Sequence, residues 1–486
     1  MTITKTNYLD YLKCPEFAWL EKHKPNAVDT TPSGYGQKLI RDGYEVEAYA
    51  QGLFPDGEIS ETFFTKDNHP SQNCLFQPTF ITEDDIEARL DILQMNADGT
   101  YDIFEVKSST SIKQNNDQDY IRDVSFQRIV LEKCGIDVAA VHIIYLNDDY
   151  IREAELDIEK LFITEDVTDE VNNILGNVRV EMGEAQAWFQ KDTIDESQCA
   201  CCFETRSNHC DAFTYFNGEK EKTSVYNIPR IGKNKLRLLL DDNSMDMTDV
   251  PDGFEISDKQ QLHVQAAKSG KPLIDREGIQ RLLSVYEYPL YFLDYETYQT
   301  AVPRIEGMSP HTHIPFQVSI HVLKESGEIE HAEYLGEELS QPRGLAEFLV
   351  DTVGEKGSIV VWNESFEKGR NTEMGELFAE HADFFRDMND RIVDLQDVFK
   401  TAYIHPDACG SSSLKKVLPA LLPEVTYDRL AIQDGTMAME RWEDLVTNNL
   451  PEDEVAQRRK DLLAYCELDT LAMVKIYQHL QNEVLI

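Results

Sequence analysis

Short apolar runs, typical of strands, alternate along the chain with segments whose apolar residues recur every three or four positions, as in amphipathic helices. The N-terminal part mixes both kinds, with strands expected at 88–95, 101–106 and 139–146 and helices at 8–19, 37–51 and 123–134. From residue 288 onward, strand-like runs come first and helical sequence follows, as the successive segments show: 290–295, 316–323, 330–334, 358–362 and 454–484. This pattern predicts an α/β protein of several domains.

The length of the chain also indicates more than one domain, because 486 residues exceed the usual size of one hydrophobic core. We expect a first domain at 1–216, a polar, Lys-rich helical linker at 217–287 and a second domain at 288–486. In the linker, residues 228–232 lead into a helix and resemble half of a helix-hairpin-helix, which offers backbone amides to phosphate. A plain helical linker is the competing interpretation.

The chain is strongly acidic, with a net charge of −43 from 89 acidic and 46 basic residues. Such a charge repels a polyanion at long range and argues against a sequence-reading DNA-binding protein. Bound metals would offset catalytic acids, and basic residues cluster locally at Arg230, Lys233, Lys235 and Arg237. A salt-adapted host is another explanation of the acidic surface.

The sequence contains no membrane signal. No charged-then-apolar segment opens it, and its longest apolar runs, such as 138–146, are too short to cross a bilayer. We therefore expect a soluble, cytoplasmic protein without a membrane partner.

Three acidic motifs stand in the C-terminal part. Asp294 and Glu296 end an apolar strand, where residues two apart face the same way, and residues 363–367 carry further acids after another strand. Tyr465 and Asp469 are four apart on the last helix and share a face. Four acids brought together repel one another unless divalent cations lie among them, so the motifs predict a metal-dependent enzyme.

This set resembles the DEDD superfamily of 3'-to-5' exonucleases, in the branch whose third motif is Tyr-x-x-x-Asp. The resemblance implies an RNase H-like fold and two Mg²⁺ or Mn²⁺ ions held by Asp294, Glu296, Glu367 and Asp469, with the Tyr465 hydroxyl orienting the attacking water. The second motif normally ends in Phe-Asp but here ends in Phe-Glu. Its ligand is therefore open, and two rivals of Glu367 are Glu364 and Asp394.

The same region also resembles a bacterial domain family of uncharacterised function that follows RecB-like nuclease domains. The segments that carry this resemblance are 291–297, 315–317, 362–370, 413–419 and 465–473. The family implies an architecture more clearly than a substrate.

A second candidate site lies in the N-terminal part, where two strands are joined by a hairpin-like turn at 96–99. Asp91 and Glu105 are expected to meet across this turn, with Lys107 on the face of Glu105. An ion-paired hairpin without catalysis would give the same pattern.

The pattern resembles the PD-(D/E)xK nuclease fold of restriction endonucleases, in which Asp91 and Glu105 would bind Mg²⁺ or Mn²⁺ and Lys107 would act beside them. Gln127 on the next helix stands where RecB-like members carry a glutamine. A metal ligand on an upstream helix corresponds loosely to Glu47, with Glu45 as a rival.

The nine cysteines are unevenly placed, and an odd count without a secretion signal makes a disulfide framework unexpected. Cys14 with Cys199, Cys202 and Cys210 resembles the set that holds a 4Fe-4S cluster in RecB-like nucleases of the CRISPR-associated and AddB kinds; Cys201 offers a substitute ligand. Zinc is the alternative metal, and buried free thiols are the non-metal interpretation.

The other cysteines are read as core or incidental residues, and the helix phase of Cys466 is expected to point it away from the acidic site. They are Cys74, Cys134, Cys409 and Cys466.

The resemblances together imply a protein with two metal-dependent nuclease sites that acts on nucleic acid, with DNA favoured, in processing, repair or defence. No helicase-type phosphate loop occurs in the sequence, so unwinding would need a helicase or defence-system partner. An RNA 3'-end-processing exoribonuclease is the second hypothesis. The third is a non-catalytic nucleic-acid-binding or scaffold protein.

Overall fold

The computed structural model describes residues 2–115 and 118–484 and divides the chain into two compact units. Unit 1 comprises Met1–Glu219 and Thr300–Thr312, and unit 2 comprises Lys220–Gln299 and His313–Ile486. Nearly all of the segment expected as a linker groups with unit 2, whereas the connection at Thr300–Thr312 groups with unit 1.

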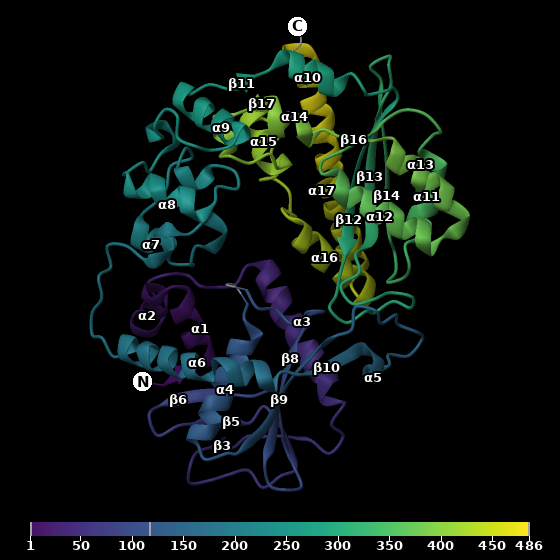
Figure 1. The fold of residues 1–486 in the computed structure, drawn as a ribbon. Coiled ribbons are helices and arrows are strands. Elements are labelled where there is room, and N and C mark those ends of the chain that lie inside the picture. The colour runs from purple at the N-terminus through teal and green to yellow at the C-terminus, as the bar shows by residue number, and fades with distance from the viewer. Residues whose placement is uncertain (1, 116–117, 485–486) are drawn as a thin grey trace. The chain divides into compact units, whose positions relative to one another are not determined.

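Unit 1 is built from strands and helices that follow the expected mixed order (Figure 1). Its strands are β1 (Ile3–Thr4), β2 (Glu58–Ile59), β3 (Phe63–Phe64), β4 (Cys74–Phe76), β5 (Thr79–Ile81), β6 (Ile86–Arg89), β7 (Ile92–Met95), β8 (Tyr101–Lys107), β9 (Val138–Leu146) and β10 (Phe162–Asp166). Its helices are α1 (Lys5–Lys13), α2 (Pro15–His23), α3 (Gly34–Gln51), α4 (Tyr120–Lys133), α5 (Ile158–Leu161), α6 (Thr168–Phe189) and α7 (Phe213–Asn217).

The larger sheet of unit 1 has the strand order β10-β9-β8-β7-β4-β2. Strands β7 and β8 form the expected antiparallel hairpin, and β8 and β9 pair in parallel. One face packs on α4 and α6 through residues such as Ile103 and Val124, and the other packs on α3 through Phe104 and Val46. The smaller sheet, β1-β6-β5-β3, shares the first of these cores.

Two elements expected to be continuous are interrupted in unit 1. The helix expected at 8–19 is divided into α1 and α2, because Cys14 is extended and Pro15 begins a new helix. The strand expected at 88–95 is divided into β6 and β7, which belong to different sheets. The first break contains Cys14 and the second contains Asp91. Both are candidate site residues from the sequence.

Unit 2 carries the expected strand-rich beginning and helix-rich end. Its strands are β11 (Leu273–Ile274), β12 (Leu290–Tyr298), β13 (Ile314–Leu323), β14 (Ile329–Leu335), β15 (Ile359–Val361), β16 (Ile392–Asp394) and β17 (Tyr403–Ile404). Its helices are α8 (Lys233–Asp241), α9 (Asp258–Ser269), α10 (Arg276–Leu283), α11 (Arg343–Thr352), α12 (Glu364–Leu377), α13 (Ala382–Asp390), α14 (Gln396–Thr401), α15 (Leu414–Leu421), α16 (Gly435–Thr447) and α17 (Glu452–His479).

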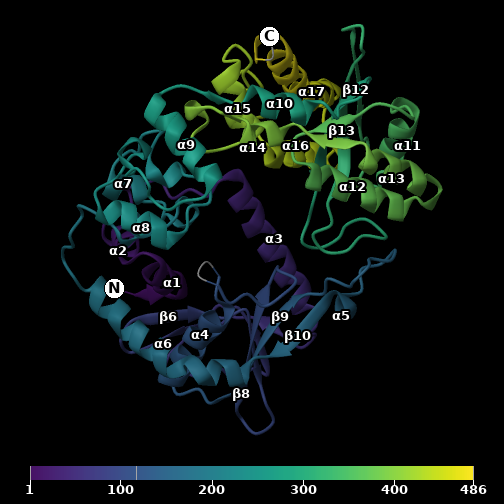
Figure 2. The ribbon, with the colours of Figure 1, turned by 45° about the horizontal axis from the view of Figure 1, so that its top comes forward.

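The main sheet of unit 2 has the order β14-β13-β12-β15-β16. Strands β14, β13 and β12 are antiparallel neighbours, and β12, β15 and β16 are parallel neighbours. Helices α11, α12 and α13 cover one face and α17 crosses the other, as both ribbon views show (Figures 1 and 2). The sheet is thus buried on two sides, which explains the nearly continuous apolar sequence of β12.

Alternation along β12 sorts its side chains between these two faces. Tyr291 and Leu293 join the core under α11 to α13, while Leu290 and Phe292 pack toward α17. Continuing this alternation places the next even-numbered residues, including Asp294, on the α17 side.

Within the described residues, no helix combines the length and the apolar character needed to span a membrane.

Candidate metal centres

Three carboxylates gather between β12 and α17. Asp294 and Glu296 come from the end of β12 and Asp469 from the middle of α17, and one oxygen of each lies within 4.8 Å of the others. The strand spacing of two and the packing of α17 on this face explain why they meet. The arrangement provides an all-oxygen donor set, the kind that Mg²⁺ and Mn²⁺ prefer.

The electrostatics of this three-carboxylate group are unfavourable without a cation. Burial, followed by the charges of Asp469 and Glu296, raises the pKa of Asp294 well above its ordinary value. Burial and the charge of Asp469 raise the pKa of Glu296 to about 8. Burial also raises the pKa of Asp469 to about 6, although a hydrogen bond from Tyr427 opposes the rise. Each shift reports a carboxylate that lacks enough positive charge around it.

Glu367 lies beside this group without belonging to its closest set. The left-handed conformation of Asn363, with φ at 106°, turns the chain from β15 into α12 and brings Glu367 into the interior, where it is 2% exposed. Its Oε2 is buried and has no hydrogen-bond partner among the described residues, and burial raises its pKa to about 8. The charge of Glu367 also raises the pKa of Asp294.

The two rivals for the second-motif ligand have partners elsewhere. The Lys368 Nζ donates to Glu364 Oε2 at 2.6 Å, and the Lys400 Nζ donates to Asp394 Oδ2 at 3.0 Å. Neither acid joins the closest set of three carboxylates. Of the three acids considered from the sequence, Glu367 is therefore the one with a buried oxygen that lacks a partner among the described residues.

Tyr465 lies next to the group, one turn before Asp469 on α17. Its hydroxyl accepts a hydrogen bond from Lys415 Nζ at 3.0 Å, and burial followed by the charges of Glu296 and Asp469 raises its pKa. A raised pKa keeps the phenol protonated, so it can donate to a water or to a substrate oxygen.

Two site residues were not found from the sequence. Tyr427 donates its hydroxyl to Asp469 Oδ1 at 2.5 Å, and Lys415 holds Tyr465 and the carbonyl of Gln433. Both come from segments outside the three motifs, and only the folded chain brings them to the acids. The only sequence signal for Lys415 is its place in the segment 413–419, which carries part of the family resemblance.

The expectation for Cys466 was wrong. Its Sγ lies 3.7 Å from the carbonyl oxygen of Asp294 and 3.9 Å from the carboxylate Oδ2 of the same residue. The side chain is fully buried against β12, because residues 462, 465, 466 and 469 all fall on the wide buried face of α17.

The N-terminal site centres on Glu105 of β8. The Lys5 Nζ donates to Glu105 Oε1 at 2.7 Å, and the Lys107 Nζ donates to the same oxygen at 2.8 Å. The Gln127 Nε2 of α4 donates to Glu105 Oε2 at 2.6 Å. Lys107 also donates to Asp123 Oδ2 at 2.5 Å. The structure therefore unites Glu105, Lys107 and Gln127 as expected and adds Lys5 and Asp123.

Two half-buried lysine ammonium groups give this site the opposite electrostatics to the three-carboxylate group. Burial raises the pKa of Glu105, but Lys107 and Lys5 outweigh it and hold the pKa well below its usual range. Burial lowers the pKa of Lys107, but Glu105 and Asp123 raise it above the ordinary value. Both groups are therefore charged at neutral pH.

Asp91 occupies the break between β6 and β7, where its Oδ2 accepts a hydrogen bond from the Val106 amide at 2.7 Å. Burial and the charge of Glu105 raise its pKa to about 8, and Glu47 of α3 contributes in the same direction. Glu47 is buried and accepts from Gln77 Nε2 at 2.8 Å. Its rival Glu45 instead pairs with Arg304 at 3.3 Å. Of the two glutamates, Glu47 is the one that acts on Asp91.

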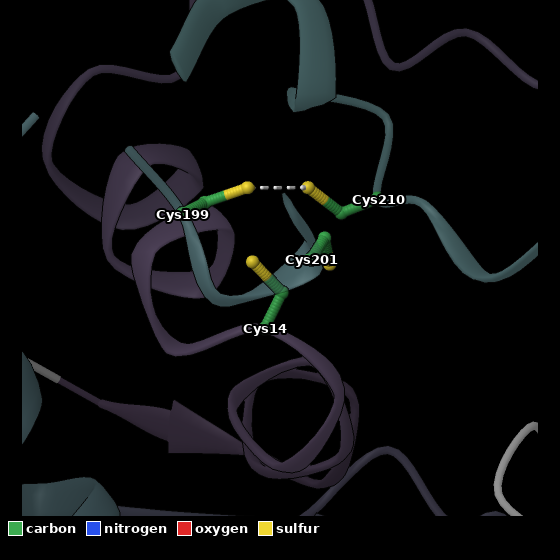
Figure 3. Close-up of side chains that lie close together, drawn as sticks. All are labelled: Cys14, Cys199, Cys201 and Cys210. Atoms are coloured by element: carbon green, nitrogen blue, oxygen red, sulfur yellow. Dashed lines mark hydrogen bonds between the residues drawn. The ribbon is translucent and has the colours of Figure 1, made fainter. Parts of the chain in front are cut away.

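Four buried cysteines form a third group, drawn in Figure 3: Cys14, Cys199, Cys201 and Cys210. One sulfur of each lies within 4.8 Å of the others, and the Sγ atoms of Cys199 and Cys210 are 4.0 Å apart. Cys14 reaches the group from the α1–α2 break, and the other three come from one segment before α7. The side chains expected from the resemblance are thus gathered, with one exchange.

That exchange concerns the two adjacent cysteines. Cys201, the substitute ligand, belongs to the group, whereas Cys202 does not and accepts a hydrogen bond from Gln198. A short 3₁₀ helix at Ala200–Phe203 sends successive side chains in different directions, so only one of the pair faces Cys14. The preference for Cys202 in the sequence-based ligand set was wrong.

One comparison with known protein families finds a match in the C-terminal half. Residues 291–413 match the model of DUF2779, a domain of unknown function. The DUF2779 match contains Asp294, Glu296 and Glu367 and stops before Tyr465 and Asp469.

Two curated proteins from Mycoplasma are similar to this chain, over 230 and 213 residues. The chain is 31% identical over 230 residues to uncharacterized protein MG366 homolog of Mycoplasma pneumoniae, covering 42% of this chain and 34% of that protein. It is 29% identical over 213 residues to uncharacterized protein MG366 of Mycoplasma genitalium, covering 39% and 32%. The matched part of the chain thus spans about a third of the length of these relatives.

Proposed function

We propose that this protein is a metal-dependent nuclease, with a 3'-to-5' exonuclease site in unit 2 and a RecB-like nuclease site in unit 1. The observation that carries the proposal is the convergence of Asp294, Glu296 and Asp469, whose oxygens lie within 4.8 Å of one another in a buried position. Such a group costs free energy in isolation and becomes favourable when divalent cations balance its charge.

The donor set fits Mg²⁺ or Mn²⁺. All candidate ligands are carboxylates, their pKa values are raised, and the buried Oε2 of Glu367 has no protein partner among the described residues. Asp294, Glu296, Asp469 and Glu367 would hold the ions. Bound divalent cations supply stabilisation of charge on the attacking and leaving oxygens of a phosphodiester.

The remaining residues of this site have roles that their contacts suggest. Lys415 fixes the Tyr465 hydroxyl, which stays protonated and can orient a water toward the phosphorus. Tyr427 restrains Asp469 through a short hydrogen bond. Positioning by such contacts keeps reacting groups in place before the chemical step.

The topology of unit 2 supports an RNase H-like, DEDD-type interpretation. The sheet joins an antiparallel meander, β14-β13-β12, to two parallel strands, and the three motifs lie at β12, at the start of α12 and on α17. The sequence resemblance expects the three motifs on these same kinds of element: a strand end, the segment after a strand, and the last helix. DUF2779 is a domain of unknown function, so the match assigns no activity to the chain. The proposed function therefore depends on the residues of the site.

In unit 1, the PD-(D/E)xK interpretation is supported by the contacts of Glu105. Lys107, Gln127 and Lys5 reach its two oxygens, and the charges of Glu105 and Glu47 both act on Asp91. Asp91, Glu105 and Glu47 are the residues that would bind Mg²⁺ or Mn²⁺ here. DNA is the favoured substrate of both sites, with a helicase or defence-system protein as partner in a cytoplasmic setting.

The four-cysteine group fits a thiolate-bound metal. The sequence resemblance favours a 4Fe-4S cluster, whereas the sulfur spacing resembles that around one zinc ion. With Zn–S bonds of about 2.3 Å, tetrahedral geometry puts neighbouring sulfurs about 3.8 Å apart, close to the 4.0 Å between Cys199 and Cys210. In either case the metal would fasten the α1–α2 break to the segment before α7.

Nuclease activity is tested on the purified chain with Mn²⁺, using 5'-labelled single-stranded DNA and RNA. We expect stepwise shortening from the 3' end, loss of that ladder in Asp294→Asn, and an unchanged ladder in Asp351→Asn, an exposed aspartate on α11. RNA cut faster than DNA would assign the exoribonuclease alternative. A wild-type protein that is folded, binds Mn²⁺ and cuts neither polymer would contradict the proposal and leave the scaffold alternative.

The thiolate metal is tested by iron and zinc analysis of anaerobically purified protein. Cys201→Ser is expected to lower the bound metal strongly, and the neighbouring Cys202→Ser serves as the matched control that retains it. A brown protein with a broad absorption band near ~400 nm supports the iron-sulfur form. A colourless protein with one zinc per chain supports the single ion, and neither metal in either state would reject a metal at this group.

A further inference from the structure

A second group of metal-ligand residues lies on the sheet of unit 2, away from the three carboxylates. His321 of β13, His331 of β14 and Glu467 of α17 each offer one ligand atom within 4.8 Å of the others. His321 and His331 are directly opposite each other across the β13–β14 pair. Their rings are stacked with centroids 4.3 Å apart.

The hydrogen bonds around the two imidazoles determine which nitrogens carry protons. Thr470 Oγ1 lies 3.1 Å from the Glu467 carbonyl oxygen, which can only accept, so the Thr470 hydroxyl donates there. Ser319 Oγ is 2.8 Å from Thr470 Oγ1 and must therefore donate to it. The two hydroxyl protons are then both used.

It follows that both histidines act as donors to these hydroxyls. His321 Nδ1 is 2.8 Å from Thr470 Oγ1, and His331 Nε2 is 3.0 Å from Ser319 Oγ. Each contact needs a proton, and each hydroxyl has already donated its own. In the neutral rings the lone pairs are therefore on His321 Nε2 and His331 Nδ1.

One of these lone pairs faces the carboxylate. His331 Nδ1 is 4.0 Å from Glu467 Oε1, too long for a hydrogen bond but within the span of two ligands across one ion. Glu333 adds a second acid at the edge of the group. Its Oε2 lies 4.0 Å from His331 Nε2, and it is buried without a hydrogen-bond partner among the described residues.

We propose that His321, His331 and Glu467 form a binding site for a divalent first-row transition-metal ion of the zinc type. Imidazole ligands suit Zn²⁺, whereas the all-carboxylate group beside Asp294 suits Mg²⁺ or Mn²⁺, so the two sites would select different ions. Ligating histidines commonly donate their other ring N–H to a protein group, as both do here through Thr470 and Ser319. The three ligands of this site are all different from those of the proposed nuclease sites.

An ion bound at this position would link three elements of unit 2. It would join β13, β14 and α17, and Glu467 is two residues before Asp469 on the same helix. An ion there would restrain the part of α17 that presents Asp469 to β12.

The test uses the full chain, stripped with a chelator and then loaded with Co²⁺, whose unpaired electrons shift the proton resonances of its ligands. Proton NMR should show two strongly shifted, solvent-exchangeable imidazole N–H signals, from His321 Nδ1 and His331 Nε2. The thiolate group and the three-carboxylate group contain no imidazole, so neither produces such signals. Absence of shifted exchangeable signals from folded protein would overturn the proposal.

Variants assign the signals to this site. His331→Ala should abolish both signals and lower bound zinc by one equivalent per chain, whereas His381→Asn, a half-buried histidine outside the group, should change neither. If His331→Ala does not fold, Glu467→Gln is the second variant, because it changes a partly exposed side chain and preserves its shape. Glu467→Gln should weaken Co²⁺ binding about 10-fold or more. Equal zinc content and unchanged signals in folded His331→Ala or Glu467→Gln would contradict the assignment.

Discussion

In unit 1, Glu105 lies between the ammonium groups of Lys5 and Lys107, whereas in unit 2 Asp294, Glu296 and Asp469 face one another. The protein's own cations hold the pKa of Glu105 low, while the pKa of Glu296 rises to about 8. In unit 2, Lys415 acts on the acids through space, but its hydrogen bonds go to Tyr465 and Gln433.

Two acidic sites in one chain therefore depend on external cations to different degrees. The lysines of unit 1 balance Glu105 within the fold, so its site can persist intact without metal. The carboxylates of unit 2 have the more distant charge of Lys415, and they gain most from a divalent ion. Four changes, ordered from the largest expected effect to the smallest, test this contrast.

The largest effect is expected on activity. Glu296→Gln should lower Mn²⁺-dependent 3'-end shortening by about 1,000-fold or more, because it removes a metal ligand from the exonuclease site. Asp91→Asn in unit 1 should leave this shortening within about twofold. Comparable losses from both changes in gel assays would show that the two sites do not act separately.

The next effect concerns folding in the absence of metal. Glu105→Gln leaves the half-buried ammonium groups of Lys5 and Lys107 with Asp123 as their remaining counter-charge. We expect it to destabilise unit 1 by about 2 to 3 kcal/mol. Hydrogen exchange of peptides from β8 and α4 in chelator measures this locally. Glu170→Gln, an exposed acid on α6, is the control. Protection of β8 equal to that of the wild type would refute the compensation by lysines.

A smaller effect is expected from Tyr427→Phe. The loss of its 2.5 Å hydrogen bond frees Asp469, and partners of metal ligands typically contribute about 10-fold to metal affinity. Mn²⁺ titration calorimetry would record the change. Tyr403→Phe, another buried tyrosine of unit 2, should bind like the wild type. Equal affinity in both variants would remove Tyr427 from the site.

The smallest effect has the opposite sign from that of Glu105→Gln. In chelator at about pH 8, Asp294→Asn should stabilise β12 by about 1 kcal/mol, because it removes one of several mutually repelling acids. Hydrogen exchange of the β12 peptide provides the measurement. A clear loss of protection there would mean that the charge of Asp294 is already compensated within the fold.

The sequence predicted the parts of these sites that depend on local geometry. Strand spacing placed Asp294 with Glu296, and helix spacing placed Tyr465 with Asp469, because neighbours within one element keep fixed directions. The hairpin between β7 and β8 likewise brought Asp91 close to Glu105. Contacts of this kind follow from the residue order alone.

The parts that were missed depend on tertiary packing. Lys5 is 100 positions before Glu105, and Tyr427 is 42 positions before Asp469, so no periodicity links them. The choice of Cys201 over Cys202 depends on one short 3₁₀ turn. The inward direction of Cys466 depends on how wide a face of α17 the sheet buries.

We expect Asp294, Glu296 and Asp469 to bind divalent cations jointly, and anomalous diffraction from a Mn²⁺-soaked crystal measures this. We expect an anomalous peak among these three residues, with Mn–O distances of about 2.2 Å to their carboxylates. A crystal saturated with Mn²⁺ that shows no peak there, with the three carboxylates bonded to protein groups instead, would contradict it.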